Sequence, residues 1–328
     1  MKPKLYPLRF TPILKERIWG GNKLLQLYNK ESYLNDGIGE SWEISGVLGD
    51  VSSVANGHFK GRNLNELIHQ YGAELLGTEV SQNFGNQFPV LIKYIDAKED
   101  LSIQLHPDDA LAKKRHQSLG KTEMWYIMHA EADAKLALGF KKGTDQKDYK
   151  KALAQAKLTD IIHYQSVKAG EVFFIAPGLV HAIGGGIVLA EIQQTSDVTY
   201  RVYDYNRKDA QGNLRELHTD LAKEAIKFEL PEPALIDYDV KRNQNTHLVH
   251  CPHFKTDLLA IDQKIELTQD NASFSIIMSV ENNSILQHQQ RNYTLNTGQS
   301  ILIPASIDTV SLAPAEGENS SKLLQIKI

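Results

Sequence analysis

Residues 101–106, LSIQLH, carry three polar side chains of types that can bind metal ions or substrates. In a β-strand successive side chains point to opposite faces, so Ser102, Gln104 and His106 share one face and the apolar residues between them share the other. We expect the polar face to point into a barrel. Taken alone, the same pattern is also typical of an ordinary half-exposed strand, and that reading of the segment stays open.

Two later segments supply further side chains of this kind. In the segment KTEMWY, Lys121 and Glu123 share one face of a second expected strand. In the segment APGLVHAIGGG, His181 follows a proline–glycine turn at the end of a third strand. Two imidazoles, a carboxylate and the amide oxygen of Gln104 suit a borderline divalent ion such as zinc, with one coordination position left open for substrate or water.

Short strands make up most of the chain that must position these residues. They are rich in β-branched and aromatic residues and are bounded by Gly, Pro, Asp or Asn. The predicted strands cover residues 89–97, 101–107, 123–129, 171–177, 186–194, 198–206, 273–280, 284–290, 299–305 and 309–314. Helical spacing of apolar residues or helix-start signals predict helices over residues 63–76, 107–119, 145–158 and 219–228. This combination predicts a mainly β protein built from barrels or sandwiches.

A short internal repeat predicts two barrels of related plan. Residues 170–177, GEVFFIAP, resemble residues 298–304, GQSILIP, because each segment is a turn glycine, an apolar strand and a proline. Four residues beyond the two prolines stand His181 and Asp308, respectively. The second barrel is therefore predicted to lack the metal ligands of the first.

Two prolines, Pro231 and Pro233, mark the boundary between the predicted domains. They end the fourth helix and favour an extended connector. We predict a metal-binding catalytic domain with helices over residues 1–229 and a C-terminal barrel without metal over residues 230–328. The histidines of the second domain are predicted to be surface or structural residues: His247, His250, His253 and His288.

The composition is that of a globular protein with a small excess of acidic residues. The net charge of −4 gives no reason to expect nucleic acid as a partner. No stretch approaches the roughly 20 apolar residues that span a bilayer, and prolines interrupt the N-terminus where a signal peptide would have its apolar core. A single cysteine, Cys251, excludes an intramolecular disulfide. We predict a cytoplasmic protein that binds neither membranes nor nucleic acid, and the sequence predicts no oligomeric state.

Taken together, the motifs resemble those of the type I mannose-6-phosphate isomerases, which belong to the cupin superfamily. The cupin pattern is a His-rich strand, a downstream Glu and a Pro-Gly-x-x-His turn. Here QLH takes the place of the usual His-x-His pair and is followed by KTEMWY and PGLVH. The segments RIWGG, GESWEIS, PVLIKYIDAKEDLSIQLHPDD and EIQQTSDVTYRVYDYNR resemble the family as well. The short spacing between Glu123 and His181 is similar to that of the short bacterial form.

The resemblance implies both a fold and a reaction. The implied fold is a double cupin, mainly β, with a few helices packed on the first barrel. The implied cofactor is one zinc ion per chain, bound by Gln104, His106, Glu123 and His181. The implied activity is that of an aldose–ketose isomerase, an intramolecular oxidoreductase that interconverts mannose 6-phosphate and fructose 6-phosphate through an enediol.

The resemblance also implies catalytic residues. Moving a proton between C2 and C1 needs a base and a group that stabilises negative charge on oxygen. The family marks Arg201 as catalytic and places Lys121 and Glu191 in the site, without deciding which of these two transfers the proton. A structural explanation stays open for each residue. Arg201 could form an ion pair with Asp197, Lys121 could be an ordinary surface lysine, and Glu191 could stand at an exposed strand end.

The substrate phosphate needs a cationic pocket. Lys93 and Arg207 occupy positions where the family has basic residues. Six residues of extended strand span roughly 20 Å, so Arg201 and Arg207 can reach one sugar only if the chain turns, which residues 204–206 would allow. The glycines at 184–186 lack the lysine of a phosphate-binding loop and predict a tight turn instead.

Two other functions stay open at this point. A non-haem iron cupin dioxygenase would use His106, Glu123 and His181 as a facial triad, and Gln104 and the basic residues argue against it. A non-catalytic sugar-binding cupin would need neither the complete ligand set nor a cation such as Arg201 inside the barrel.

Overall fold

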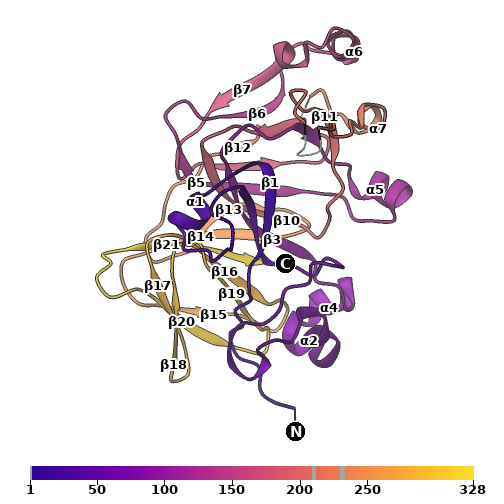
Figure 1. Ribbon diagram of the computed structural model, residues 1–328. Coiled ribbons are helices and arrows are strands. Elements are labelled where there is room, and N and C mark those ends of the chain that lie inside the picture. The colour runs from indigo at the N-terminus through magenta and orange to yellow at the C-terminus, as the bar shows by residue number, and fades with distance from the viewer. Residues whose placement is uncertain (1, 209–211, 230–232) are drawn as a thin grey trace.

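The computed structural model describes residues 2–208, 212–229 and 233–328. Its strands form four sheets, within which neighbouring strands run antiparallel (Figure 1). Two of the sheets make up the N-terminal module, and two make up the C-terminal module. The predicted domain boundary between residues 229 and 230 lies at the edge of a segment outside the described residues, so this division stays a prediction.

The N-terminal module consists of a seven-stranded sheet and a five-stranded sheet. The seven-stranded sheet has the order β1 (Ile13–Gly21), β2 (Ile38–Ile44), β3 (Val90–Ala97), β10 (Ile187–Gln194), β5 (Glu123–Ala130), β8 (Val172–Ile175) and β12 (Leu235–Ile236). The five-stranded sheet has the order β11 (Tyr200–Tyr203), β4 (Ile103–Leu105), β9 (His181–Ile183), β6 (Lys135–Phe140) and β7 (Ile162–Ser166). Because β12 pairs with β8, the chain stays in the first module beyond residue 230.

The C-terminal module repeats this plan with fewer strands. Its five-stranded sheet has the order β13 (Thr246–His250), β14 (Lys255–Ile261), β21 (Ser321–Lys327), β16 (Ser275–Glu281) and β19 (Ser300–Ile303). Its four-stranded sheet has the order β15 (Ile265–Thr268), β20 (Thr309–Pro314), β17 (Ser284–His288) and β18 (Arg291–Leu295). The predicted internal repeat is confirmed, because Gly170 and Gly298 both have positive φ angles and precede β8 and β19.

Three apolar layers hold the four sheets together. One layer lies between the two sheets of the N-terminal module and includes Trp125, Leu136 and Leu189. A second joins the two sheets of the C-terminal module. The third packs the seven-stranded sheet against the C-terminal five-stranded sheet, so every residue of β3 and β10 is buried. Strands buried on both faces need continuous apolar runs, which explains the composition of residues 89–97.

The helices cover two regions of the sheets. Packed on the outer face of the first five-stranded sheet are α6 (Gln146–Ala154), η2 (Leu158–Ile161) and α7 (Thr219–Ala225). At the junction of the two modules, α2 (Leu64–Tyr71), α3 (Ala73–Leu76) and α4 (Thr78–Phe84) add side chains to the shared core (Figure 1). The remaining helical segments are α1 (Lys23–Gln26), η1 (Gly57–Phe59) and α5 (Asp109–His116).

The mainly β fold of paired sheets and the predicted strands are confirmed, and two details of the prediction were wrong. Of the two predicted arrangements, the paired sheets adopt the sandwich and do not close into barrels. The helix predicted over residues 63–76 breaks at Gly72, whose φ of 53° an L-residue rarely adopts. The group α2 to α4 packs on both modules and not on the first alone. Among the described residues, no helix is long and apolar enough to cross a membrane.

Candidate active site and metal centre

Strand register brings the predicted metal ligands together from separate parts of the chain. In the first five-stranded sheet, Gln104 on β4 pairs with His181 on β9 and with Arg201 on β11. Glu123 is the first residue of β5 in the facing sheet, and His106 directly follows β4. The predicted alternation is confirmed, because Ile103 packs outward in the helix-covered core while Gln104 lines an internal cavity.

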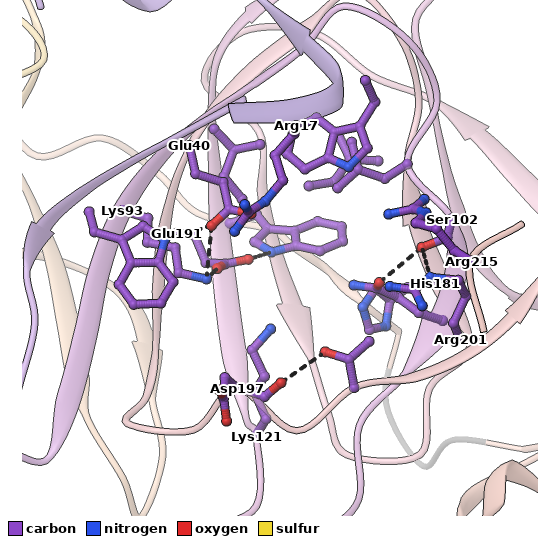
Figure 2. Close-up of a pocket in the computed structure, with 18 residues that line it drawn as sticks. Arg17, Glu40, Lys93, Ser102, Lys121, His181, Glu191, Asp197, Arg201 and Arg215 are labelled. Atoms are coloured by element: carbon purple, nitrogen blue, oxygen red, sulfur yellow. Dashed lines mark hydrogen bonds and ion pairs between the residues drawn. The ribbon is translucent and has the colours of Figure 1, made fainter. Parts of the chain in front are cut away.

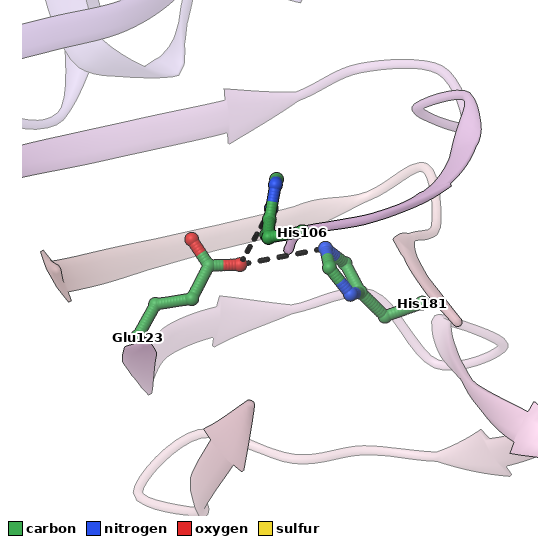
Figure 3. Close-up of side chains that lie close together, drawn as sticks. All are labelled: His106, Glu123 and His181. Atoms are coloured by element: carbon green, nitrogen blue, oxygen red, sulfur yellow. Dashed lines mark ion pairs between the residues drawn. The ribbon is translucent and has the colours of Figure 1, made fainter. Parts of the chain in front are cut away.

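The donor atoms of three of these residues converge. Glu123 Oε1 lies 3.3 Å from Nε2 of His106 and 3.4 Å from Nε2 of His181, with all three side chains buried (Figure 3). The side-chain donors of this group lie within 4.8 Å of one another. Gln104 lines the same cavity as His181, and its amide oxygen accepts a hydrogen bond from the Ser102 hydroxyl at 3.3 Å.

The second nitrogen of each imidazole fixes its protonation state. Nδ1 of His106 lies 2.9 Å from the carbonyl of Val198, and Nδ1 of His181 lies 2.9 Å from the carbonyl of Leu179. A carbonyl only accepts, so both Nδ1 atoms carry the proton and both Nε2 atoms present lone pairs. Burial lowers the pKa of His181 to about 3, and burial together with the Lys121 charge lowers the pKa of His106.

These lone pairs need a positive charge between them. Burial works to raise the pKa of Glu123, but the charge of Lys121 outweighs it and holds that pKa well below its ordinary value. Glu123 is therefore a carboxylate, and its Oε1 faces two nitrogen lone pairs. Nε2 of His181 has no hydrogen-bond partner within the described part of the chain. Buried acceptors that face one another without a proton fit a metal ion bound among them.

Lys121 lies beside this cluster. Its ammonium nitrogen is 2.8 Å from Glu123 Oε2 and 3.1 Å from His106 Nε2. Burial works to lower the pKa of Lys121, but the charges of Glu123 and Glu191 outweigh it and leave the pKa raised. Lys121 is thus a buried cation at the edge of the candidate metal centre and not the surface lysine of the alternative reading.

The cluster borders a cavity of about 450 Å³, a size typical of small-ligand sites. Figure 2 shows Lys93 and Glu191 on one side of it and Arg201 and His181 on the other. Both sheets of the N-terminal module contribute to the lining. The polar and charged residues among the lining are Arg17, Glu40, Lys93, Ser102, Gln104, Lys121, His181, Glu191, Asp197, Thr199, Arg201 and Arg215.

Glu191 is held by its two neighbours in the sheet. It stands opposite Lys93 on β3 and opposite Trp125 on β5. Its Oε1 lies 3.0 Å from the Lys93 ammonium, and its Oε2 accepts a hydrogen bond of 2.9 Å from the Trp125 indole. Burial raises the pKa of Glu191, and the Lys93 charge opposes that shift in part. The residue is buried and lines the cavity, so the exposed-strand-end reading was wrong.

Three further residues of this wall were missed as site residues, although two of the quoted motifs contain them. Arg17 in RIWGG and Glu40 and Trp42 in GESWEIS meet because β1 and β2 pair at this edge. Glu40 accepts hydrogen bonds from Arg17 at 2.7 Å and from the Trp42 indole at 2.6 Å. Burial works to raise the pKa of Glu40, but Lys93 and Arg17 outweigh it and bring the pKa to about 2.

Arg201 enters the cavity from the opposite sheet. Its guanidinium donates to the Glu216 carbonyl at 2.9 Å and to the Ser102 hydroxyl at 3.3 Å, and both acceptors are uncharged. Burial and the nearby Arg215 lower the pKa of Arg201, but a guanidinium stays protonated at neutral pH. Within the described part of the chain, no carboxylate forms an ion pair with Arg201, so the pair with Asp197 in the alternative structural reading does not form.

Arg207 is the one predicted site residue that belongs neither to the cavity lining nor to the buried cluster of His106, Glu123 and His181. The chain turns as anticipated, with positive φ angles at Tyr205 and Asn206. However, the Arg207 guanidinium donates to the Asp100 carbonyl at 2.5 Å and to Asp204 at 2.6 Å. Arg215, which sequence reasoning did not select, lines the cavity instead and also pairs with Asp204.

Comparisons with known proteins agree with this geometry. The family model for the phosphomannose isomerase type I catalytic domain matches residues 8–121, and the model for the mannose-6-phosphate isomerase cupin domain matches residues 244–318. The mannose-6-phosphate isomerase ManA of Bacillus subtilis is 34% identical over 310 residues, covering 93% of this chain and 95% of that protein. The mannose-6-phosphate isomerase of Streptococcus mutans is 32% identical over 302 residues, covering 92% and 93%.

A solved structure extends the similarity to the whole fold. The crystal structure of the mannose 6-phosphate isomerase from Bacillus subtilis superposes with a TM-score of 0.87 at 31% sequence identity. The match covers 99% of this chain and 100% of that one. Both modules are therefore shared, together with the sheets that hold the buried cluster. The chain is an isomerase and belongs to the type I mannose-6-phosphate isomerase family.

Proposed function

We propose that this chain interconverts mannose 6-phosphate and fructose 6-phosphate with one zinc ion bound by Gln104, His106, Glu123 and His181. The observation that carries the proposal is the convergence of three buried acceptors beside a cavity lined by cations, with His181 Nε2 and Glu123 Oε1 left without a hydrogen-bond donor among the described residues. Two imidazoles, a carboxylate and an amide oxygen match the ligands of catalytic zinc sites. Such an ion, when bound, polarises substrate oxygens and stabilises the negative charge that develops on them.

Glu191 is the better candidate for the proton-transferring base. A base must be unprotonated and have a pKa near the working pH, and burial moves the pKa of Glu191 in that direction. Hydrogen bonding to Trp125 and pairing with Lys93 fix the orientation of the carboxylate. Lys121 is paired with Glu123 and has a raised pKa, so it is a cation that donates hydrogen bonds. We assign it to stabilising charge on the enediol oxygens.

Arg201 supplies the positive charge that the substrate requires. Arg17, Lys93, Lys121 and Arg215 each have a carboxylate partner that offsets their charge. Because Arg201 bonds only to uncharged acceptors among the described residues, its charge remains available to an anionic ligand. We propose that it stabilises the enediolate or holds the phosphate.

Phosphate binding by Lys93 and Arg207 has unequal support. Lys93 lines the cavity, although Glu191 and Glu40 offset its charge. Arg207 lies outside the lining and is bonded to Asp204. Arg215 and Arg17 line the cavity and are stronger candidates than Arg207.

No observation favours the two other functions. A dioxygenase does not need the cations that line the cavity. A sugar-binding module does not need a carboxylate with a raised pKa inside the cavity. The predicted cytoplasmic location also stays a proposal, with the free thiol of Cys251 as its support.

Substrate specificity tests the proposed function directly. The purified chain should convert mannose 6-phosphate to fructose 6-phosphate in a coupled assay and should show little turnover of unphosphorylated mannose. Equal rates with both sugars would contradict the proposed binding of the substrate phosphate by the cations that line the cavity. Oxygen consumption with bound iron, or no turnover of any hexose phosphate by zinc-loaded protein, would refute the isomerase assignment.

A further inference from the structure

A second group of potential metal ligands lies in the C-terminal module, on the hairpin of β13 and β14. Nδ1 of His247 is 2.7 Å from Asp257 Oδ1, and Nε2 of His250 is 2.8 Å from the same oxygen. The two imidazole rings lie edge to face with centroids 4.5 Å apart. This group shares no residue with the buried centre described above and is open to solvent, with His247 70% exposed and His250 39% exposed.

An irregularity in the hairpin places both histidines on the same face. His247 stands opposite Asp257 in the ladder, and the register shifts between His247 and Val249. Leu248 and Val249 are consecutive and both buried, so the normal alternation of faces is interrupted. In a regular strand, residues three apart point to opposite faces. The bulge therefore turns His250 back to the face that already carries His247 and Asp257, an arrangement that bulges commonly produce at functional positions.

A hydrogen bond to its second oxygen holds the carboxylate of Asp257 in place. The side-chain amide of Asn245 donates to Asp257 Oδ2 at 2.9 Å and to Gln325 Oε1 at 2.9 Å. Gln325 is buried on β21, directly opposite Asp257 in the ladder. One carboxylate oxygen is thus fixed by a partner on the protein side, while Oδ1 stays directed at the two imidazoles. Outer hydrogen bonds of this kind are typical of metal-binding carboxylates.

We propose that His247, His250 and Asp257 bind a second divalent ion of the borderline class, to which zinc, nickel and copper belong. Two imidazoles and a carboxylate are ligands that these ions prefer. Bonds of about 2.0–2.1 Å to zinc separate tetrahedral ligand atoms by roughly 3.3 Å, so the contacts need to open by only about half an ångström. Solvent completes the coordination shell. The prediction that the C-terminal module holds no metal would then be wrong.

The main competing explanation is that the histidines only donate hydrogen bonds to Asp257. Metal binding requires a lone pair on each ligating nitrogen, so the ring proton must move to the other nitrogen. For both rings water can solvate that other nitrogen, because both side chains are exposed. The exchange of tautomers therefore costs little, and direct measurement of bound zinc decides between the two explanations.

The test uses the full-length protein, dialysed to equilibrium against buffered free Zn²⁺ over a range of concentrations and analysed for metal. Wild type should bind two equivalents and His250→Ala one. His181→Ala should lose the first equivalent and retain the second, which shows that the sites are independent. His288→Ala, which removes a partly exposed histidine of the same module, should still bind two. Asn245→Ala should weaken the second equivalent by about tenfold or more, the scale for losing an outer-shell partner.

Several outcomes would overturn the proposal. Wild type could saturate at one zinc ion, or His250→Ala could retain both equivalents with unchanged affinity. Anomalous scattering at the zinc edge tests the site in crystals of the wild type, without any variant. The absence of a peak between β13 and β14 would also overturn the proposal. His250→Ala should keep wild-type isomerase activity, because the site lies apart from the catalytic cavity.

Discussion

Replacing Glu191 by Gln removes the proposed base while leaving most of its surroundings intact. The side chain keeps its shape, and its amide oxygen can still accept the hydrogen bond from the Trp125 indole. Lys93 loses one partner but keeps Glu40, whose Oε2 lies 3.8 Å from the ammonium. Glu191 does not belong to the converging donors of the metal centre, so the variant should fold and bind one equivalent of zinc in the catalytic site.

The expected loss of rate in Glu191→Gln follows from the role of Glu191 as general base. A positioned general base contributes about 10²- to 10⁴-fold to the rate, and each tenfold change corresponds to about 1.4 kcal/mol of barrier. Glu191→Gln should therefore lower kcat by at least about 100-fold, or roughly 3 kcal/mol. KM should change little, because the amide leaves the shape of the cavity intact.

Two measurements check this prediction. Steady-state turnover of mannose 6-phosphate gives kcat and KM, and substrate incubated in deuterated water reports proton exchange at C1 and C2. Both should fall together in Glu191→Gln and stay at the wild-type level in the control Glu131→Gln, which alters an exposed carboxylate paired with Lys23. A kcat within tenfold of wild type, with exchange intact, would refute the assignment of Glu191 as the base.

Three further predictions follow from the same geometry. Arg201→Ala should keep its zinc and lower kcat/KM by at least about 100-fold. Arg201→Lys should restore only part of the rate, because lysine lacks the planar guanidinium. A wild-type rate in Arg201→Ala would leave Arg201 a structural role only. His181→Ala should lose tight zinc binding in the catalytic site, measured by dialysis and metal analysis, and retained zinc with full activity would contradict the ligand assignment. Glu40 has its pKa lowered to about 2 in the fold, so its contribution to stability is present above its ordinary value of 4.5 and is lost as the pH falls toward 2. Urea unfolding at pH 6 and pH 3 should show wild type losing more stability than Glu40→Gln, by about 2 kcal/mol, and equal losses would contradict a buried, ionised Glu40.

The local pattern of the strands was enough to predict much of the candidate metal centre. Alternation in residues 101–106 separates Gln104 and His106 from Ile103 and Leu105, and this separation survives in the fold because the outer face is covered by helices. The same rule failed at Leu101, which lines the cavity with the polar residues, because β4 begins only at Ile103. Alternation holds only where the backbone is actually extended in a sheet.

Long-range pairing was not predictable from local pattern. Glu191 is oriented by Lys93 and Trp125, residues far away in the chain that become neighbours only through the order β3, β10, β5. Arg215 lines the cavity and Arg207 does not, although both pair with Asp204 in the loop after β11, and local pattern does not show which of the two is turned inward. The contacts of His247 and His250 were missed for a similar reason, because no sequence pattern predicts the bulge between them.

The central claim is that one metal ion at the buried cluster of His106, Glu123 and His181 is required for the isomerase reaction. The most direct test is to strip the purified chain of metal with a chelator and to measure the rate of fructose 6-phosphate formation while Zn²⁺ is added back in known amounts. The rate should start near zero, rise in proportion to zinc and level off at one equivalent per chain, with any second equivalent adding no activity. Full turnover by metal-free protein, or a rate that does not respond to the first equivalent, would contradict the account.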